Sequence, residues 1–466
     1  MKKTLLTALC TAALAAIALP AFADHQIGGY YRFNGVSELM TAVGQADGQT
    51  ADNYVDQRLR ARWQNNINEY VTVVWFGEVD VIYGEGVTKG GAKNNQTTLN
   101  DPATGKPPVV TGDTQLGGGG RQGGDGVNVE TKNAFLAVKI PNTPVSATLG
   151  LQGFGDTTFN SVVMNDDLAG VKFDVKTDMV TATVGWFKLS EGNLAEGTPA
   201  KAHSLRRSED DSDLYVAQAG LMPVPGLKLM PEFWFANNQQ TSSPADNFKQ
   251  YYAGMGAAFK LAPVDLSAWF VYEWGKNKGT DVKITSWAAS AKAGMDVAGA
   301  KLALRGMYFP KSTDADKQKY FTPPNSSNGA FEFYDDNLTI FLADINYMNT
   351  SGGRLAMTDG AYTPYGMMGA VLSGSFTPPA LKQLYVKGGA GYFTLVDDKP
   401  GDFAERQGKS LGTEVSAAVG YKVADKADVQ LRGGYAWLGK AYDGLAAGGS
   451  DPDNLYKLAV MVNVPY

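Results

Sequence analysis

The chain has 466 residues but only one cysteine and two histidines. The cysteine, Cys10, lies in an N-terminal apolar run, so a secreted scaffold held together by disulfides is excluded. Neither His25 nor His203 has an evident triad partner, and no cluster of cysteine or histidine is present. We therefore expect no metal site, no haem, no other cofactor and no enzymatic activity.

Long apolar runs are also scarce. The apolar run Leu5–Leu19 follows Lys2 and Lys3 and ends at Pro20-Ala21-Phe22-Ala23, which has the small-x-small pattern of a cleavage site. This arrangement predicts a secretory signal peptide over residues 1–23 that is removed by cleavage, because the run is short for a membrane anchor.

The remainder, residues 24–466, is expected to be a single domain. It has no apolar run of helix-spanning length, so a membrane protein here would have to cross with strands. Only helices and closed barrels satisfy the backbone in lipid. The 55 glycines and 22 tyrosines suit strands, tight turns and aromatic belts. The net charge of −6 gives no support to nucleic-acid binding.

The C-terminal segment has the clearest pattern. Large apolar residues alternate with smaller or polar ones, which predicts a strand with one lipid-type face and one lumen-type face. The lipid-type face holds Leu458, Val460, Val462, Val464 and Tyr466. The lumen-type face holds Lys457, Ala459, Met461 and Asn463. A half-buried strand of a soluble β-protein is the alternative.

The same alternation recurs along the chain, and the connections between the expected strands alternate in length. Short turns are expected at Asn65–Glu69, Pro141–Pro144, Asp178, Pro223–Gly226, Ala262–Val264, Val297–Ala300, Pro378–Gln383 and Ala424–Ala427. Long polar loops are expected at Glu85–Gly126, Glu191–Ser212, Asn237–Asn247, Lys311–Pro364, Asp397–Lys409 and Lys440–Asp453. Short periplasmic turns and long external loops are typical of outer-membrane barrels.

We therefore predict an all-β fold, a transmembrane antiparallel up-and-down β-barrel of about 16 to 18 strands. The expected location is the outer membrane of a Gram-negative bacterium. Four tryptophans are expected near the outer ends of upward strands and one near a periplasmic end, as in aromatic girdles. They are Trp186, Trp234, Trp274 and Trp437, with Trp63 at the periplasmic end.

The pattern resembles the general outer-membrane porins of Gram-negative bacteria. More loosely, it is similar to the abundant porin-like proteins of sulfate- and metal-reducing bacteria. The resemblance rests on the signal peptide, on Gly-Tyr-Tyr-Arg-Phe at 29–33, on Val-Asp-Gln-Arg-Leu-Arg-Ala-Arg-Trp at 55–63, and on the terminal strand. It implies that Leu458, Val460, Val462, Val464 and Tyr466 form the signal read by the barrel-assembly machinery.

Arginine alternates with apolar residues in one expected strand. Arg58, Arg60 and Arg62 must share a face, and that face is the lumen, because a lipid-facing arginine costs about 2–4 kcal/mol at the bilayer midplane. Glu78 and Asp80 are expected on the same face of the next strand.

The resemblance implies a constriction in which wall arginines oppose carboxylates on an inward-folded loop. The third external loop, Gly155–Asp167, supplies Asp156, Asp166 and Asp167, although it lacks the proline-glutamate signature of the family. The alternative is that the arginines neutralise wall carboxylates.

The predicted function is a porin: a water-filled channel for passive diffusion of small hydrophilic solutes and ions. There are two alternatives: a substrate-specific outer-membrane channel, and a barrel that forms a sleeve around a periplasmic electron carrier. Expected partners are outer-membrane lipids, lipopolysaccharide and the barrel-assembly machinery, with a homotrimer favoured by the resemblance. Asp335 and Asp336 are expected in an external loop, either bridging divalent ions to lipopolysaccharide or simply solvated.

Overall fold

The computed structural model describes a closed β-barrel. The described residues are 24–39, 52–83, 129–190, 211–239, 247–312, 314, 317–324, 336–342, 355–397, 408–445 and 451–466. The predicted signal peptide, residues 1–23, lies outside them. Each of the 18 wall strands pairs antiparallel with its neighbours along the chain, and the last strand pairs with the first. The predicted fold class is confirmed, at the upper end of the expected strand number.

The wall strands are 10 to 16 residues long, which is enough for a tilted strand to span a bilayer. In chain order they are β1 (Asp24–Leu39), β2 (Asp52–Asn66), β3 (Val71–Ile82), β4 (Glu130–Lys139), β5 (Val145–Gly155), β6 (Asn165–Lys176), β7 (Val180–Ser190), β8 (Ser212–Val224), β9 (Leu227–Gln239), β10 (Asn247–Leu261), β11 (Val264–Asn277), β12 (Lys283–Val297), β13 (Ala300–Phe309), β15 (Met367–Phe376), β16 (Leu384–Leu395), β17 (Ser410–Lys422), β18 (Asp428–Leu438) and β19 (Leu455–Pro465).

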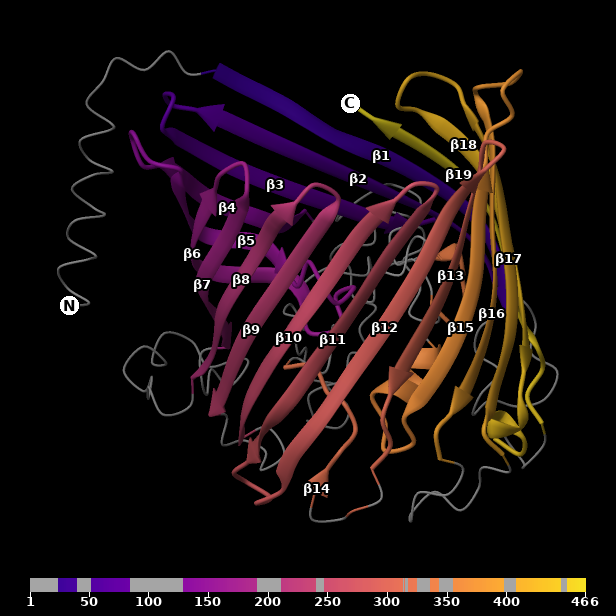
Figure 1. Ribbon diagram of the computed structural model, residues 1–466. Coiled ribbons are helices and arrows are strands. Elements are labelled where there is room, and N and C mark those ends of the chain that lie inside the picture. Colours follow the sequence, from indigo (N-terminus) through magenta and orange to yellow (C-terminus); the bar gives the residue numbers. More distant parts are fainter. Residues whose placement is uncertain are drawn as a thin grey trace, which may run out of the picture.

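Short hairpins gather at one end of the barrel together with the C-terminus and the start of β1 (Figure 1). These hairpins coincide with all eight predicted turns, for example Leu261 to Val264 between β10 and β11 and Val297 to Ala300 between β12 and β13. The longer connections lie at the other end, as the alternation of loop lengths predicts.

The seam of the barrel joins β1 to β19. Their register runs from Tyr30 opposite Pro465 to Leu39 opposite Tyr456. The backbones of Gly29 and Tyr466 exchange two hydrogen bonds of 3.0 and 3.1 Å, so pairing continues to the last residue. The C-terminal aromatic residue is therefore part of the closure.

The terminal strand has the two faces that its sequence predicts. Leu458 and Val460 are 50% and 46% exposed on the outer face, whereas Lys457, Ala459 and Met461 are each 3% exposed on the inner face. The same rule holds on β13, where the outward Leu304 is exposed and the inward Arg305 is buried. The outer face is thus apolar along these strands, as a lipid-facing wall requires.

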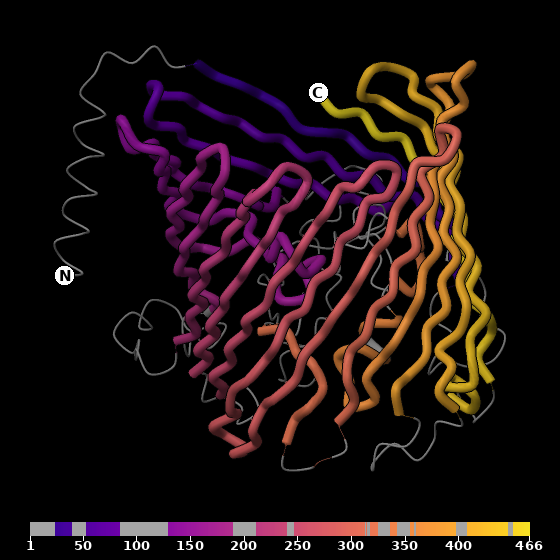
Figure 2. The backbone as a smooth tube through the Cα atoms, viewed as in Figure 1, coloured from indigo at the N-terminus to yellow at the C-terminus, as the bar shows by residue number. Residues whose placement is uncertain are grey.

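The interior is filled at the loop end by segments that fold inward (Figure 2). We call residues 156–164, between β5 and β6, the first inward segment, and residues 336–342, between β13 and β15, the second. Residues 317–324, which include the two-residue strand β14 (Lys317–Gln318), and the π-helix η4 (Met357–Ala361) pack beside them. The short helix η5 (Lys440–Tyr442) follows β18.

Buried apolar side chains of these segments form one cluster with the inner wall. The largest buried members include Phe159, Trp234, Tyr252, Phe321 and Phe341. Within the described residues, no helix has the length and apolar character that a membrane-crossing helix needs.

Candidate functional site: the barrel interior

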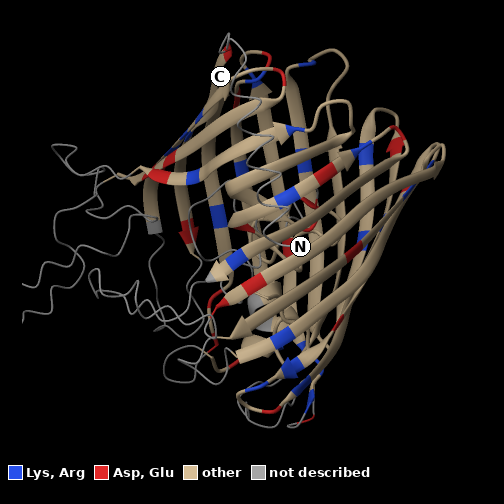
Figure 3. Cartoon of the chain, turned by 90° about the vertical axis from the view of Figure 1, so that its left-hand side faces the viewer, with Lys and Arg blue, Asp and Glu red and all other residues tan. Residues whose placement is uncertain are grey.

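The predicted arginine row lies on the inner face of β2 and is paired with β3. Arg58 bonds Asp80 through Nε at 2.7 Å and Nη2 at 2.6 Å, and its Nε lies 3.1 Å from Glu78. Arg60 forms an ion pair with Glu78. These contacts follow from the register, which sets Arg58 opposite Asp80 and Arg60 opposite Glu78. Figure 3 shows basic and acidic positions side by side on neighbouring strands.

The third arginine of the row differs from the other two. Arg62 stands opposite Phe76, with no carboxylate across the strand pair, and its side chain is exposed. The structure therefore brings together Arg58, Arg60, Glu78 and Asp80 as a wall network, and leaves Arg62 as the arginine of the row that faces open space.

Asp156 organises the first inward segment. Its carboxylate accepts hydrogen bonds of 2.8 to 3.3 Å from four backbone N–H groups, those of Phe159, Ser161, Val163 and Met164. Burial of the carboxyl, together with the nearby charge of Glu232, raises the pKa of Asp156 to about 7. The carboxylate is thus enclosed by its own segment and does not oppose the arginine row.

Asp166 and Asp167 stand at the loop end of β6. Asp167 forms an ion pair of 2.9 Å with Lys132 on β4 and accepts a bond of 3.0 Å from Asn133. Gly153 on the intervening β5 lies beside this contact, since an added Cβ there would be 3.5 Å from the Asp167 carboxylate, an ordinary van der Waals distance. Lys132 also lies 4.0 Å from Glu78, so Asp167 adjoins the β2–β3 network through that lysine.

The first inward segment lies along the inner wall from β8 to β13. Gln218 on β8 donates to the Gly155 carbonyl, and Glu232 on β9 accepts from the backbone and hydroxyl of Thr157. Gly254 and Gly256 on the inner face of β10 leave room for it. A Cβ on Gly254 would lie 2.7 Å from the Phe159 ring, and one on Gly256 would overlap Thr158.

The second inward segment is held against β16, β17 and β18 in the same way. Glu414 on β17 accepts bonds from the backbone N–H groups of Thr339, Ile340 and Phe341. Gly389 and Gly391 on β16 leave room for the segment, since an added Cβ at Gly391 would lie 2.8 Å from Leu338.

A third buried wall carboxylate holds residues 317–324. Glu273 on β11 accepts bonds of 3.0 and 2.8 Å from the backbone N–H and the hydroxyl of Thr322, and Tyr252 donates to the Thr322 carbonyl at 2.6 Å. Three wall carboxylates therefore hold three inward segments by backbone hydrogen bonds: Glu232, Glu273 and Glu414.

These functional residues were not predicted from the sequence. Their signal was present in part, because single glutamates stand at lumen-type positions of β9, β11 and β17, and Gly-x-Gly pairs stand at such positions of β10 and β16. A buried carboxylate needs hydrogen-bond partners, and a wall without side chains admits a neighbouring backbone. The sequence does not show which distant loop supplies the hydrogen-bond donors for these glutamates, or which backbone packs against these glycines.

Two predictions about individual residues are wrong. Trp234 was expected in an outer aromatic girdle, but its side chain is fully buried on the inner face, where Nε1 donates to Glu232 at 3.0 Å and the ring packs on Phe154. The outward aromatics of β9 are Phe233 and Phe235. Because the inward segments cover this half of the wall, apolar side chains are buried on its inner face beside Glu232 and Glu273, and an aromatic residue there is not a sign of lipid contact.

Asp336 was expected in a solvated or ion-bridging external loop. It lies instead within the barrel and is fully buried, 2.7 Å from the Nε of Arg305 and 3.6 Å from Lys292. The loop folds inward, so the charge is paired with the wall. Asp335 lies outside the described residues.

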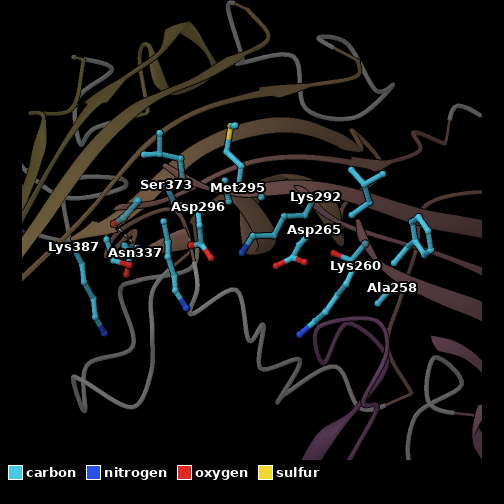
Figure 4. A pocket seen from close by; sticks show the side chains of 18 of the residues that line it. Ala258, Lys260, Asp265, Lys292, Met295, Asp296, Asn337, Ser373 and Lys387 are labelled. Carbon is cyan, nitrogen blue, oxygen red and sulfur yellow. Dashed lines mark hydrogen bonds between the residues drawn. The ribbon is translucent and has the colours of Figure 1, made fainter. Parts of the chain in front are cut away.

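An open recess lies at the hairpin end of the interior. It has a volume of about 580 Å³, and its charged lining consists of five basic residues, Lys260, Lys292, Lys301, Lys387 and Arg432, interleaved with two acidic ones, Asp265 and Asp296. Figure 4 shows Lys260 and Lys387 extending away from the wall into the same space.

Several of these lysines have no ion-pair partner. In the part of the chain that the structure describes, Lys260, Lys301 and Lys387 form no ion pair, and the ammonium group of Lys387 lies 5.4 Å from the centre of the Tyr385 ring. A second recess of about 690 Å³ shares Ser375 and Lys387 with the first. Unpaired cations in a concave, low-dielectric wall produce a positive potential.

No metal site is formed among the described residues, where no three of the side chains of His, Cys, Asp and Glu stand close enough to hold an ion.

No protein-family model matches the chain, and no curated protein sequence matches it either. Solved structures do. The chain is similar to OccAB1 of Acinetobacter baumannii, with 12% identity and a TM-score of 0.55 over 95% of this chain and 96% of that one. It is similar to the BenF-like porin of Pseudomonas fluorescens Pf-5, with 11% identity and a TM-score of 0.55 over 95% and 98%. It is also similar to OpdK of Pseudomonas aeruginosa solved with vanillate, with 11% identity and a TM-score of 0.54 over 95% and 98%. At such identities the likeness shows the fold, so the chain is built on the same kind of barrel as these outer-membrane porins.

Proposed function

We propose that the protein is an outer-membrane channel for passive diffusion of small hydrophilic solutes and ions. The observation that carries the proposal is the division of the closed wall into an apolar outer face and a charged recess inside. On β13, Leu304 faces outside and is 57% exposed, whereas its neighbour Arg305 projects inward and is 5% exposed, and Lys301, on the same face as Arg305, lines the interior recess. A wall of this kind is stable only with lipid on one side and water on the other.

Within this function, small anions are the favoured solutes. Lys260, Lys301 and Lys387 form no ion pair among the described residues, and the basic residues of the recess outnumber Asp265 and Asp296, so a hydrated anion is attracted without being trapped. The vanillate in the OpdK structure is itself an organic anion. These two observations support a channel that prefers solutes of one charge. Its selectivity would then be intermediate between that of a general porin and that of a substrate-specific channel, the two possibilities that the sequence leaves open.

The remaining predictions belong to the same proposal. They are the absence of enzymatic activity, a homotrimer, contact with lipopolysaccharide, assembly through the terminal strand, and a relation to the porin-like proteins of sulfate- and metal-reducing bacteria. The exposed apolar face of β19 supports the assembly signal, because Val460, Val464 and Tyr466 are accessible along one side of the seam strand.

The test is planar-bilayer recording of the purified, folded protein. We expect stepwise, roughly ohmic conductance and, in a salt gradient, a reversal potential that indicates anion preference. Replacing Lys260, Lys301 and Lys387 together with Met should move that potential towards cations, while a Lys139→Met control on β4 should not. Folded protein that conducts nothing would contradict the channel. Conductance with no effect of the triple variant would remove the anion preference alone.

A further inference from the structure

Two inward segments from distant parts of the chain meet at one wall residue. The first inward segment follows β5, and the second precedes β15. Both contact the side chain of Arg305, which projects inward from β13 and is 5% exposed. β13 lies eight strands from β5 in a wall of 18, so the first segment reaches a distant part of the barrel to make this contact.

The contacts of Arg305 divide between the two segments. Nε lies 2.7 Å from the Asp336 carboxylate of the second segment, and Nη1 donates to Asn160 Oδ1 of the first at 3.3 Å. Nη1 also lies 3.4 Å from Ser290 Oγ on the neighbouring β12. A guanidinium has five donors in a rigid plane, so one side chain can serve a carboxylate and an amide at fixed angles.

The tip of the first segment is shaped for this contact. Asn160 and Ser161 both have left-handed backbones, with φ of 58° and 60°, which are costly for residues other than glycine. Asp156 stabilises the tip by accepting from the Ser161 N–H at 2.9 Å. The result is that Asn160 Oδ1 accepts from Trp269 Nε1 at 2.8 Å as well as from Arg305. Such conformations persist where the surroundings require them.

We propose that Arg305 is a positioning residue that joins the two inward segments to each other and to the wall, and so fixes the internal cross-section of the channel. This rests on the proposed channel function. Asp336 is fully buried, so its charge requires cations, and the nearer of its two, Arg305 at 2.7 Å against Lys292 at 3.6 Å, also holds the first segment. Loss of the guanidinium therefore loosens both segments at once.

The test measures segment mobility without measuring conduction. Ser161 is buried at the tip, and Ser161→Cys would be the only cysteine once residues 1–23 are removed. In folded protein this thiol should react slowly with a small water-soluble reagent. Adding Arg305→Met should speed the reaction by about tenfold or more, because local opening exposes the tip. Lys301→Met, which removes an inward cation from the same strand without a segment contact, should leave the rate unchanged.

Coupling between the segments gives a second measurement. Asp336→Asn should also speed the reaction at Ser161→Cys, and combining it with Arg305→Met should add nothing, because both act on one junction. If Arg305→Met does not fold, Asn160→Gly removes the tip contact and keeps the left-handed backbone. Unchanged reactivity in Arg305→Met, or in Asn160→Gly where that variant is used, would overturn the proposal, and so would an equal rise in Lys301→Met.

Conductance then separates this proposal from the function. If the wild type conducts, Arg305→Met should give noisier open-channel current than wild type, and Lys172→Met, which removes a cation paired with Asp174 outside the recess, should not. A wild type that conducts nothing would count against the channel, whereas faster thiol reaction in Arg305→Met would still support the junction.

Discussion

Arg58 on β2 and Asp80 on β3 form a bidentate ion pair, with Nε–Oδ1 at 2.7 Å and Nη2–Oδ2 at 2.6 Å. Their side chains are 13% and 10% exposed on the inner face. The pair fits the interpretation in which wall arginines neutralise wall carboxylates, and it leaves the selectivity of the channel to charges that are not paired.

Replacing Arg58 with Met should destabilise the barrel by about 3–5 kcal/mol, because Asp80 would be left partly buried without its partner. The free energy of unfolding, measured in denaturant by the loss of heat-modifiable gel mobility, should fall accordingly. Adding Asp80→Leu should restore most of the loss. A double variant as unstable as Arg58→Met would contradict the pairing.

Replacing Arg62 alone with Ser should account for most of the selectivity change produced by replacing Arg58, Arg60 and Arg62 together. Arg62 is the exposed member, and the other two are compensated by Glu78 and Asp80. The reversal potential should move towards cations. The shift should shrink as salt rises, since the screening length falls from about 10 Å at 0.1 M to about 3 Å at 1 M. A shift that appears only when Arg58 or Arg60 is also replaced would show that these arginines contribute to the charge selectivity.

Single cysteines at Lys301 and Leu304 should react oppositely in intact membranes. Both residues of β13 are accessible in the isolated barrel, but an odd number of positions separates them, so they face opposite sides of the wall. A small water-soluble thiol reagent should label position 301 through the interior and spare position 304, which lipid covers. Labelling of position 304 alone would place the register one residue out.

Deleting Tyr466 should prevent assembly in the outer membrane. Its backbone closes the seam with Gly29, and its hydroxyl donates to the Arg60 carbonyl at 2.9 Å. The heat-modifiable form in outer-membrane fractions should disappear, and Tyr466→Phe, which keeps the ring and the backbone, should retain it. Normal levels after deletion would show that the terminal aromatic residue is dispensable.

Replacing Gly256 with Val should destabilise the packing of the first inward segment, at a cost of about 1–3 kcal/mol for an overfilled interior. The added side chain would overlap Thr158. Gly306 on β13 is the control, because a Cβ there meets nothing within 4 Å. The temperature of the heat-modifiable transition should fall for Gly256→Val and stay nearly constant for Gly306→Val. Equal falls in both would point to strand propensity instead of contact with the segment.

Local patterns predicted the wall well. The facing of Lys457, Leu458 and Val460, the pairing of Arg58 with the β3 carboxylates as one of two open interpretations, and all eight short turns agree with the structure. Side chains alternate along a strand by geometry alone, and a hairpin turn is set by the few residues within it. The inward folding of the third loop also agrees. Asp156, however, accepts hydrogen bonds from the backbone of its own loop, whereas it was expected to oppose the wall arginines.

The sequence by itself determined the barrel, because strand faces, turn positions and strand lengths depend on residues that are neighbours in the chain. Only the tertiary structure decided what fills the interior. Trp234 packs on Phe154, Asp336 pairs with Arg305, and Glu414 bonds to Thr339, which is 75 residues away in the chain; no local period encodes which loop reaches which strand. The inward face buries aromatic residues and hydrogen-bonded carboxylates where a segment covers it and exposes charged side chains where water reaches it, so the environment of each inner residue depended on contacts that only the closed barrel creates.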